Sequence, residues 1–334
     1  MGVKLWDLIP KKEVSIDDLK NKTLVVDASP VLYQFLTSIR QPGGVPLLDS
    51  KNRITSHLMG IFSRVSNLLM NNVKLCFVFD GKPPLLKIKE TEEREYKKQI
   101  AEKKFKEAQE QEDIILMTKY SKRFVRLSDE IINESKELLR AFGIPVIQAP
   151  SEAEAQCAFI AEQGDAYAIV SQDADSLLSG TPRLIRNLTI SQKRRLPSGQ
   201  VVNIKPEIIE LKNVLSFLDI NQDQLIVLAI LIGTDYNREG VKKVGPKSAL
   251  KLVKQYHDFN ELFKEVKADF NWKEIYAVFK SMPIMKNYQL KFSSPDNKKI
   301  KEILVEEHDF DEKRVINTLN KLNKPREQGL NKWF

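Results

Sequence analysis

Seven acidic residues of this 334-residue chain stand where short apolar runs end or helices begin. Brought together without partners, these carboxylates would repel one another, and several would have to bind protons. A pair of hard cations relieves this repulsion, because Mg²⁺ or Mn²⁺ takes oxygen ligands and keeps positions open for water. Two such ions about 4 Å apart suit phosphodiester hydrolysis, since both can stabilise charge on the attacking and leaving oxygens. The seven residues are Asp27, Asp80, Glu152, Glu154, Asp173, Asp175 and Asp235.

Short apolar runs, rich in β-branched and aromatic residues, position most of these acids. TLVVD ends at Asp27, LCFVFD ends at Asp80, AYAIVSQDAD ends with Asp173 and Asp175, and PVIQAP at 145–150 is a fourth candidate strand. Stretches of helical periodicity alternate with the runs, which predicts an α/β fold with a mostly parallel central sheet flanked by helices. Right-handed crossovers bring the carboxyl ends of such strands to one edge, so the acids should meet there. The helical stretches run over 56–71, 129–142 and 151–163.

Each acid also has a purely structural interpretation. Asp27 or Ser29 before Pro30 is typical of a helix N-terminus, and Ser151 with Glu154 forms a capping-box pattern. The remaining acids fit turns or solvated loops. These structural interpretations would have to hold at five separate places at once, so the joint pattern favours a site that binds divalent cations.

The composition indicates a polyanionic partner. The chain has 53 Lys and Arg against 45 Asp and Glu, a formal net charge of +8, and a pI near 9.2, which favours nucleic acid. The longest apolar run, 225–232, is much shorter than the ~18 residues of a membrane span, and the N-terminus lacks the pattern of a signal peptide. Cys76 and Cys157 lie in apolar stretches and predict buried thiols in a reducing compartment. Neither secretion nor a membrane partner is expected.

Three basic clusters refine this picture, although each alone could be a solvated charged face. The segment 82–126 is dense in both signs and too poor in apolar residues to bury a face, so it should project from the body. Residues 193–195 precede a Pro-Ser-Gly turn at 197–199 and predict a basic β-ribbon. Gly245 and Lys247 fit the hairpin of a helix-hairpin-helix element, in which backbone N–H groups meet DNA phosphates.

Five segments together resemble the flap structure-specific endonucleases of the 5′-nuclease superfamily. They are VVDASPVLYQFL, VFDGKPP, APSEAEAQCA, SQDADSLL and LIGTDY, in the family's order and near its spacing. The resemblance covers nearly the whole chain. It implies an enzyme that hydrolyses phosphodiester bonds, removes 5′ flaps from branched DNA in replication (Okazaki fragment maturation) and repair, and has 5′–3′ exonuclease activity. The core would be PIN-like, with a helical arch and a helical C-terminal lobe that contains the hairpin element.

The resemblance also implies a cofactor. Two Mg²⁺ ions are expected in each active site, with Mn²⁺ able to substitute. Asp27, Asp80, Glu152 and Glu154 would lie principally around one ion, and Asp173, Asp175 and Asp235 around the other. K⁺ is a further ion that members bind at the hairpin. Here the hairpin reads KKVGPKS, is one residue longer, and has Lys243 where a first Gly is common, so K⁺ binding is left open.

Two cations at the start of the charged segment are the expected catalytic side chains. Lys87 and Arg94 are seven residues apart, which places both on one face of a helix. In the family the matching cations contact the scissile phosphate, where positive charge stabilises the transition state. Tyr33 matches the aromatic residue on which a base stacks. An ordinary basic helix face and a core tyrosine are the alternatives. The expected DNA-binding residues are Gly2, Tyr33, Lys193, Arg194, Arg195, Gly245 and Lys247.

The last residues resemble a motif that binds a sliding clamp. Leu330, Trp333 and Phe334 lie at i, i+3 and i+4, so one helical turn would present three anchors. When these anchors are aligned with the motif, Glu327 occupies the position of the motif's glutamine, and Gln328 lies one residue after it. A frayed terminus is the alternative interpretation. The expected regions are 1–126 with an arch at 82–126, 127–256 with a helix-hairpin-helix at 224–256, a lobe at 257–324 and a clamp-binding tail at 325–334.

Two other functions stay open. A smaller PIN-type ribonuclease shares the acidic edge, but the arch, the hairpin and the C-terminal helices argue against it. A clamp-tethered DNA-binding scaffold with a decayed site is the non-enzymatic alternative, and the complete set of acids argues against that. The ending without a basic extension resembles archaeal members, which favours the cytoplasm or nucleoid over a eukaryotic nucleus. The protein is expected to be a monomer on its own.

Overall fold

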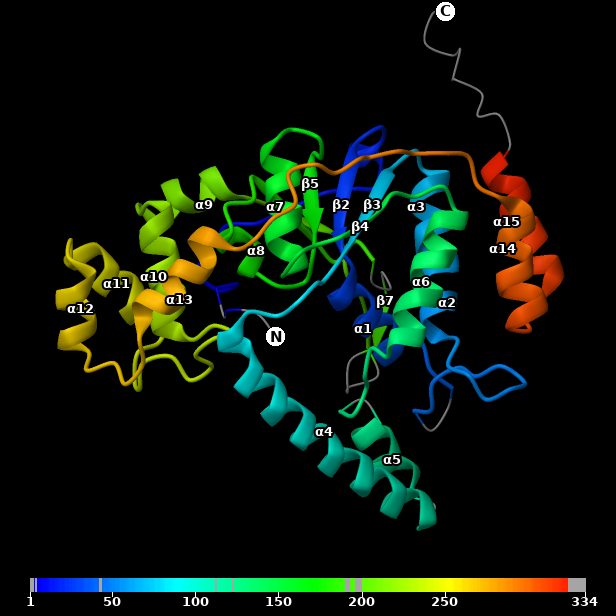
Figure 1. The fold of residues 1–334 in the computed structure, drawn as a ribbon, viewed down its shortest axis with the longest axis horizontal. Helices are drawn as coiled ribbons and strands as arrows, with labels where there is room; N and C mark the ends of the chain where they lie inside the picture. Colours follow the sequence, from blue (N-terminus) through cyan, green and yellow to red (C-terminus); the bar gives the residue numbers. More distant parts are fainter. Residues whose placement is uncertain are drawn as a thin grey trace, which may run out of the picture.

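A mixed sheet forms the centre of the protein (Figure 1). The computed structural model describes residues 3, 5–41, 44–111, 113–121, 123–189, 193–195 and 200–323. Within them, seven strands run in the order β1-β9-β6-β5-β2-β3-β4. The five strands from β6 to β4 pair in parallel, and β1 and β9 add an antiparallel edge. The strands are β1 (Lys12–Glu13), β2 (Thr23–Asp27), β3 (Lys74–Phe79), β4 (Val146–Gln148), β5 (Ala168–Val170), β6 (Arg183–Arg186) and β9 (Glu207–Glu210). The predicted α/β class and mostly parallel sheet are confirmed.

Helices cover both faces of this sheet. They are α1 (Ala28–Ser38), α2 (Ser56–Gly60), the π-helical η2 (Ile61–Val65), α3 (Ser66–Met70), α6 (Asp129–Ala141), α7 (Ala153–Glu162), α8 (Asp175–Leu178) and α10 (Gln222–Ile232). Along β2, Leu24 and Val26 face a hydrophobic core shared with α1, α2, α3 and α6. Val25 faces a second core with α7, α8 and α10. Because both faces are buried, the strands are apolar on both sides, which explains their unbroken apolar runs.

The charged segment projects from the body as a helical hairpin (Figure 1). It consists of α4 (Leu85–Glu110) and α5 (Ile114–Ser121). Ala101 and Ala108 are buried. The returning chain is tied to α4 by Arg126, whose guanidinium lies 2.7 Å from Glu95 and 2.8 Å from Glu102. The charge pattern therefore predicted the projection, and within it ion pairs supplement a few apolar contacts, such as that between the Phe105 and Phe124 rings, whose centres are 5.2 Å apart.

The basic ribbon forms as predicted at the level of the backbone. Strand β7 (Lys193–Arg195) pairs antiparallel with β8 (Val201–Asn203). The turn at 196–199 lies outside the described residues.

The C-terminal helices divide between two ends of the molecule, unlike the single lobe expected at 257–324 (Figure 1). Helices α11 and α13 pack against α10, and α12 packs against α11. At the other end α14 packs against α6 and α15 against α3, with η3 between α14 and α15. The segment 282–296 crosses between the two ends, and the buried Gln156 amide binds the Met285 main chain at 2.9 and 2.6 Å. Both cores need a cover, which explains the division. The remaining helices are η1 (Asp17–Leu19), α9 (Leu211–Leu218), α11 (Pro246–Gln255), α12 (Phe259–Glu265), α13 (Trp272–Ser281), α14 (Asn297–Lys301), η3 (Glu302–Glu307) and α15 (Glu312–Asn323).

Among the described residues, no single helix has the length and apolarity to cross a membrane. Helices α9 and α10 are long and apolar enough only when taken together, and they form a pair bent by 78°.

Candidate active site

The seven acids gather at the edge where the parallel strands end. Their positions are Asp27 at the end of β2, Asp80 after β3, Glu152 and Glu154 at the start of α7, Asp173 and Asp175 after β5, and Asp235 after α10. Burial raises the pKa of Asp27 well above its usual range, and the charges of Asp80, Asp173 and Glu152 raise it further. Partial burial raises the pKa of the Tyr236 hydroxyl, and the charges of four of the acids raise it further; they are Glu152, Glu154, Asp235 and Asp175. The crossovers therefore bring together acids that lie far apart in the sequence.

Hydrogen bonds hold Asp80 at this edge. Its Oδ1 accepts the backbone N–H of Ala153 at 2.8 Å, and its Oδ2 accepts the hydroxyl of Ser29. Ser29 is thus engaged with an acid and does not cap α1, whose N-cap residue, Asp27, makes no side-chain cap either. The Ser151 hydroxyl donates to the carbonyl of Lys82 at 2.9 Å and leaves α7 without a side-chain cap. Helix α1 thus begins where the sequence indicated, with Asp27 as its N-cap residue, but the expected side-chain caps of α1 and α7 are absent, so the capping explanation of these residues is wrong.

Burial also raises the pKa of two further acids of the cluster, Glu154 and Asp175. Burial and the charge of Asp175 raise the pKa of Glu154 well above its usual range. Burial, with the charges of Asp235 and Asp173, raises the pKa of Asp175 to about 7, although the N–H of Val3 donates to its Oδ1 at 2.8 Å. These carboxyl groups are kept near one another at an electrostatic cost.

Lys87 and Arg94 extend from the base of α4 into the acidic cluster. The Lys87 ammonium pairs with Glu152 and lies 3.7 Å from Asp235 Oδ2. Arg94 Nη2 donates to Asp235 Oδ1 at 2.8 Å. Burial disfavours the charged amine, but the charges of Glu152 and Glu154 outweigh burial and raise the pKa of Lys87. The spacing of seven residues on one helix therefore delivers both cations to the acids.

The cluster has the donors that divalent ions require. Its side chains offer carboxylate oxygens, and Asp27 Oδ1 is buried without a hydrogen-bond partner. As they stand, no three His, Cys, Asp or Glu side chains in the described residues are arranged to enclose one ion. Mutual repulsion and the pairing of Glu152 and Asp235 with Lys87 and Arg94 account for this spread. The donor chemistry fits hard divalent cations.

Comparison with known proteins identifies the family. The XPG N-terminal domain matches residues 1–101 and the XPG I-region matches residues 143–235. Flap endonuclease 1 of Staphylothermus marinus is 50% identical over 349 residues, covering 100% of both chains. Flap endonuclease 1 of Pyrococcus abyssi is 47% identical, covering 100% of this chain and 98% of the relative. The chain belongs to the flap endonuclease family.

Solved structures agree with this membership. Flap endonuclease-1 from Methanococcus jannaschii is 41% identical, with a TM-score of 0.77 over 96% of this chain and 98% of that chain. The catalytic core of Rad2 in complex with a DNA substrate is 23% identical, with a TM-score of 0.70 over 96% of this chain and 100% of that chain, and shows the shared fold alone. Nucleases of this family act on phosphodiester bonds and depend on metal ions.

Among the other DNA contacts expected of this family member, the structure describes the side chains of Tyr33 and Lys247 and the backbone of Gly245. The Tyr33 hydroxyl accepts from Lys98 Nζ at 3.2 Å, and the ammonium lies 5.5 Å from the ring centre, so Tyr33 faces the arch and is not a core residue. Gly245 is the N-cap residue of α11, at φ −92°, with open space where a Cβ would be, and Lys247 is exposed. Lys243 adopts φ +66° in place of the common glycine. Gly2 and the side chains of residues 193–195 lie outside what the structure describes, as do Gln328, Leu330, Trp333 and Phe334.

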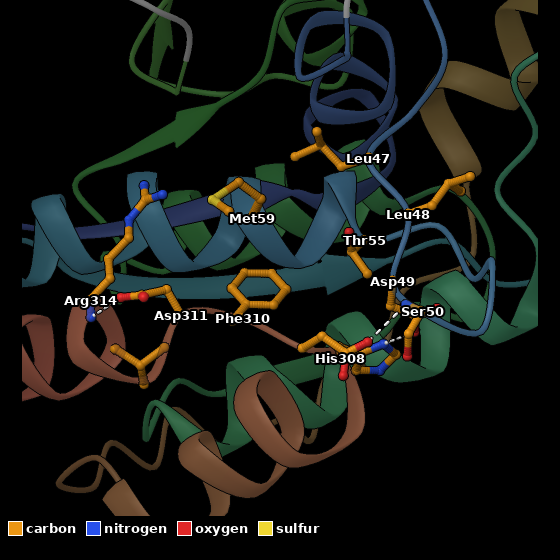
Figure 2. Close-up of a pocket in the computed structure, with 12 residues that line it drawn as sticks. Leu47, Leu48, Asp49, Ser50, Thr55, Met59, His308, Phe310, Asp311 and Arg314 are labelled. Atoms are coloured by element: carbon orange, nitrogen blue, oxygen red, sulfur yellow. Dashed lines mark hydrogen bonds and ion pairs between the residues drawn. The ribbon is translucent and has the colours of Figure 1, made fainter.

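A cavity of this family member is lined by none of the seven acids (Figure 2). It has a volume of about 420 Å³, and Leu47, Met59, Phe310 and Arg314 are among its lining residues. At its edge, His308 Nδ1 lies 3.1 Å from Asp49 Oδ2 and thereby joins the 47–55 loop to the end of η3 (Figure 2). No spacing in the sequence predicted this long-range contact, and it has a structural role.

The raised pKa of Asp175 predicts how the metal-free stability of this family member varies with pH. The folded state holds this proton up to about pH 7 and the unfolded state releases it near 3.8, so stability falls as pH rises between these values. Asp175→Asn, which keeps the acceptor for Val3, should remove that loss. We expect a gain of up to about 4 kcal/mol at pH 8 and none at pH 4, measured by thermal unfolding in EDTA.

The control for this prediction is Asp17→Asn, because Asp17 is an exposed acid paired only with Lys20 among the described residues. It should leave the unfolding temperature unchanged at both pH values. An Asp175→Asn protein that unfolds below the wild type at pH 8 in EDTA would contradict the argument.

Proposed function

We propose that the protein is a structure-specific 5′ flap endonuclease that cleaves branched DNA with two Mg²⁺ ions, for which Mn²⁺ can substitute. The observation that carries the proposal is the meeting of buried acids at the sheet edge with two cations from the arch. Family membership and the basic composition support a DNA substrate. Exonuclease activity on 5′ ends would use the same residues.

The acids have the role of metal ligands in this proposal. Asp27, Asp80, Glu152 and Glu154 would hold principally one ion, and the other set would hold the second. Bound divalent ions would supply Lewis-acid stabilisation of the phosphate oxygens and a nucleophilic hydroxide at neutral pH. The second set consists of Asp173, Asp175 and Asp235.

Lys87 and Arg94 would bind the scissile phosphate. In the structure they pair with Glu152 and Asp235, so both cations already lie within the cluster. A phosphate placed there would receive two pre-positioned positive charges, which stabilise the extra charge of the transition state. Because the cations belong to α4, the position of the arch would govern cleavage.

Aromatic and cationic side chains on the arch support the proposal that a single-stranded flap passes along it. Around the Tyr120 ring, Lys104, Lys119 and Arg123 each lie within 5.7 Å of the ring centre. Tyr96 on α4 is also exposed. Aromatic faces interleaved with cations are typical of surfaces that bind single strands by base stacking and phosphate contact.

The biological setting follows from the same proposal. The protein would act in DNA replication and repair, as a monomer tethered to a sliding clamp through Gln328, Leu330, Trp333 and Phe334. The spacing of these tail residues supports the clamp contact. The cytoplasm or nucleoid would be its location. We retain K⁺ as a candidate ion at the hairpin, where the exposed Lys243 takes the place of a glycine.

The proposal is tested with the purified full chain and three labelled substrates: a 5′-flap DNA, the matching linear duplex and a single-stranded RNA. We expect Mg²⁺-dependent cleavage at the base of the flap, and DNA affinity that falls as salt rises through counterion release. Equal or better cleavage of the RNA would favour a PIN-type ribonuclease. Flap binding without cleavage, together with no Mn²⁺ binding in calorimetry, would favour a scaffold.

A further inference from the structure

Asp235 lies in a turn that is closed mainly by the Asn237 side chain, and within it the Thr234 hydroxyl accepts the N–H of Tyr236 at 3.1 Å. The N–H of Asn237 donates to the carbonyl of Thr234 at 3.2 Å, so Asp235 and Tyr236 are the central residues of the turn. In return, Asn237 Oδ1 accepts both the N–H and the hydroxyl of Thr234, at 3.1 and 2.7 Å. The turn is therefore closed from both ends by Asn237.

The same amide completes the end of α10. In a continuing helix the carbonyl of Ile230 would accept the N–H of Thr234. Here the carbonyl accepts Asn237 Nδ2 at 2.7 Å, while the N–H of Thr234 binds Asn237 Oδ1. The side chain is thus inserted between a donor and an acceptor that would otherwise pair, and it satisfies groups that a helix end leaves open. Gly233 allows the departure at φ +113°, where a Cβ would come within 2.5 Å of the Arg238 carbonyl.

The turn aims its two central side chains at different neighbours. Asp235 reaches the arch cations, at 2.8 Å from Arg94 and 3.7 Å from Lys87. The Tyr236 ring packs edge-to-face on Phe279 of α13, with ring centres 5.4 Å apart. Asp235 is the acid contributed from beyond the sheet, so its position depends on this turn and not on a strand end.

We propose that Asn237 is a positioning residue for Asp235, and this inference rests on the function proposed above. By holding the turn against the end of α10, its amide sets the distance of the Asp235 carboxylate from the other acids. It also couples this carboxylate to the helix that leads into the hairpin. Side chains that orient metal ligands in this way typically change metal affinity or activity by about 10- to 100-fold when replaced.

The amide of asparagine is the group that fits this position. An aspartate would keep the acceptor for Thr234 but lose the donor to Ile230 and add a charge two residues from Asp235. An alanine would leave the N–H of Thr234 and the carbonyl of Ile230 without these partners. In the sequence, Asn237 stands directly after LIGTDY and carries no motif of its own.

The experiment compares Asn237→Ala and Thr234→Val with two matched variants. Thr234→Ser keeps the hydroxyl that binds Asn237 and should restore wild-type behaviour. Asn271→Ala removes a comparable cap at α13, where Asn271 accepts the N–H of Lys273 at 3.2 Å, away from the acids. We expect Mn²⁺ affinity, measured by calorimetry without DNA, to fall about 10- to 100-fold in Asn237→Ala and Thr234→Val and to stay within about twofold in the matched variants.

Kinetics and hydrogen exchange distinguish positioning from a general loss of stability. We expect kcat on flap DNA to fall about 10- to 100-fold with KM within about threefold, and the amide of Thr234 to exchange faster. The positioning role alone would be overturned if Asn237→Ala kept wild-type Mn²⁺ affinity and kcat. If Asn237→Ala does not fold, Thr234→Val provides the same test. A wild-type protein that binds no Mn²⁺ and cuts no flap would instead overturn the proposed function.

Discussion

Replacing Asp173 with alanine should abolish cleavage while leaving DNA binding intact. The Asp173 charge acts on both Asp27 and Asp175, so its carboxylate belongs to the acidic cluster. Lewis-acid stabilisation contributes several kcal/mol to phosphodiester hydrolysis, and each ~1.4 kcal/mol is a factor of ten in rate. We expect kcat on flap DNA in Mg²⁺ to fall by about 10³-fold or more.

The affinity for flap DNA is measured separately, by fluorescence anisotropy in EDTA. It should stay within about twofold of the wild type or rise, because one repulsive charge is removed from a surface that faces phosphates. Asp17→Asn serves as the control for an acid outside the cluster. A wild-type rate of flap cleavage by the Asp173→Ala protein would remove Asp173 from the site.

The strands and their terminal acids could be predicted because two local signals coincide. An apolar run such as TLVVD indicates a buried strand, and parallel topology then requires Asp27 and Asp80 to share an edge. Both signals are local in the sequence, and the right-handed crossover rule then brings the strand ends to one edge of the sheet. The projection of 82–126 was predictable for a related reason, since a segment with so few apolar residues cannot be buried.

Contacts that depend on three-dimensional packing were not predictable. The turn around Asn237 closes through an amide whose sequence context resembles that of any surface asparagine. The division of the C-terminal helices depends on which core each amphipathic helix covers, and periodicity gives the buried face but not its partner. The capping-box pattern at Ser151 misled for the same reason, because the carbonyl of Lys82, distant in sequence, competes for the hydroxyl.

Lys87→Ala should lower kcat by about 10²- to 10³-fold, the usual effect of removing one donor that stabilises developing charge in a transition state. The ground-state affinity for flap DNA should change less than threefold, since one phosphate contact among many is lost. The two effects are separated by single-turnover cleavage with saturating enzyme and by anisotropy in EDTA. Metal binding should not weaken, because the Lys87 ammonium pairs with Glu152 and its removal frees an oxygen ligand.

Lys97→Ala is the matched control for this prediction, since Lys97 lies on the same helix, is largely exposed and pairs only weakly with Glu93 at 3.9 Å. It should cleave like the wild type. A Lys87→Ala protein with a normal single-turnover rate would mean that the ammonium does not act on the phosphate and only neutralises Glu152. A loss of Mn²⁺ affinity in this variant would point to a third role, in which Lys87 orders the acids instead of competing for them. The arch would then prepare the metal site before any DNA enters, so the order of metal and substrate binding depends on the behaviour of this one side chain.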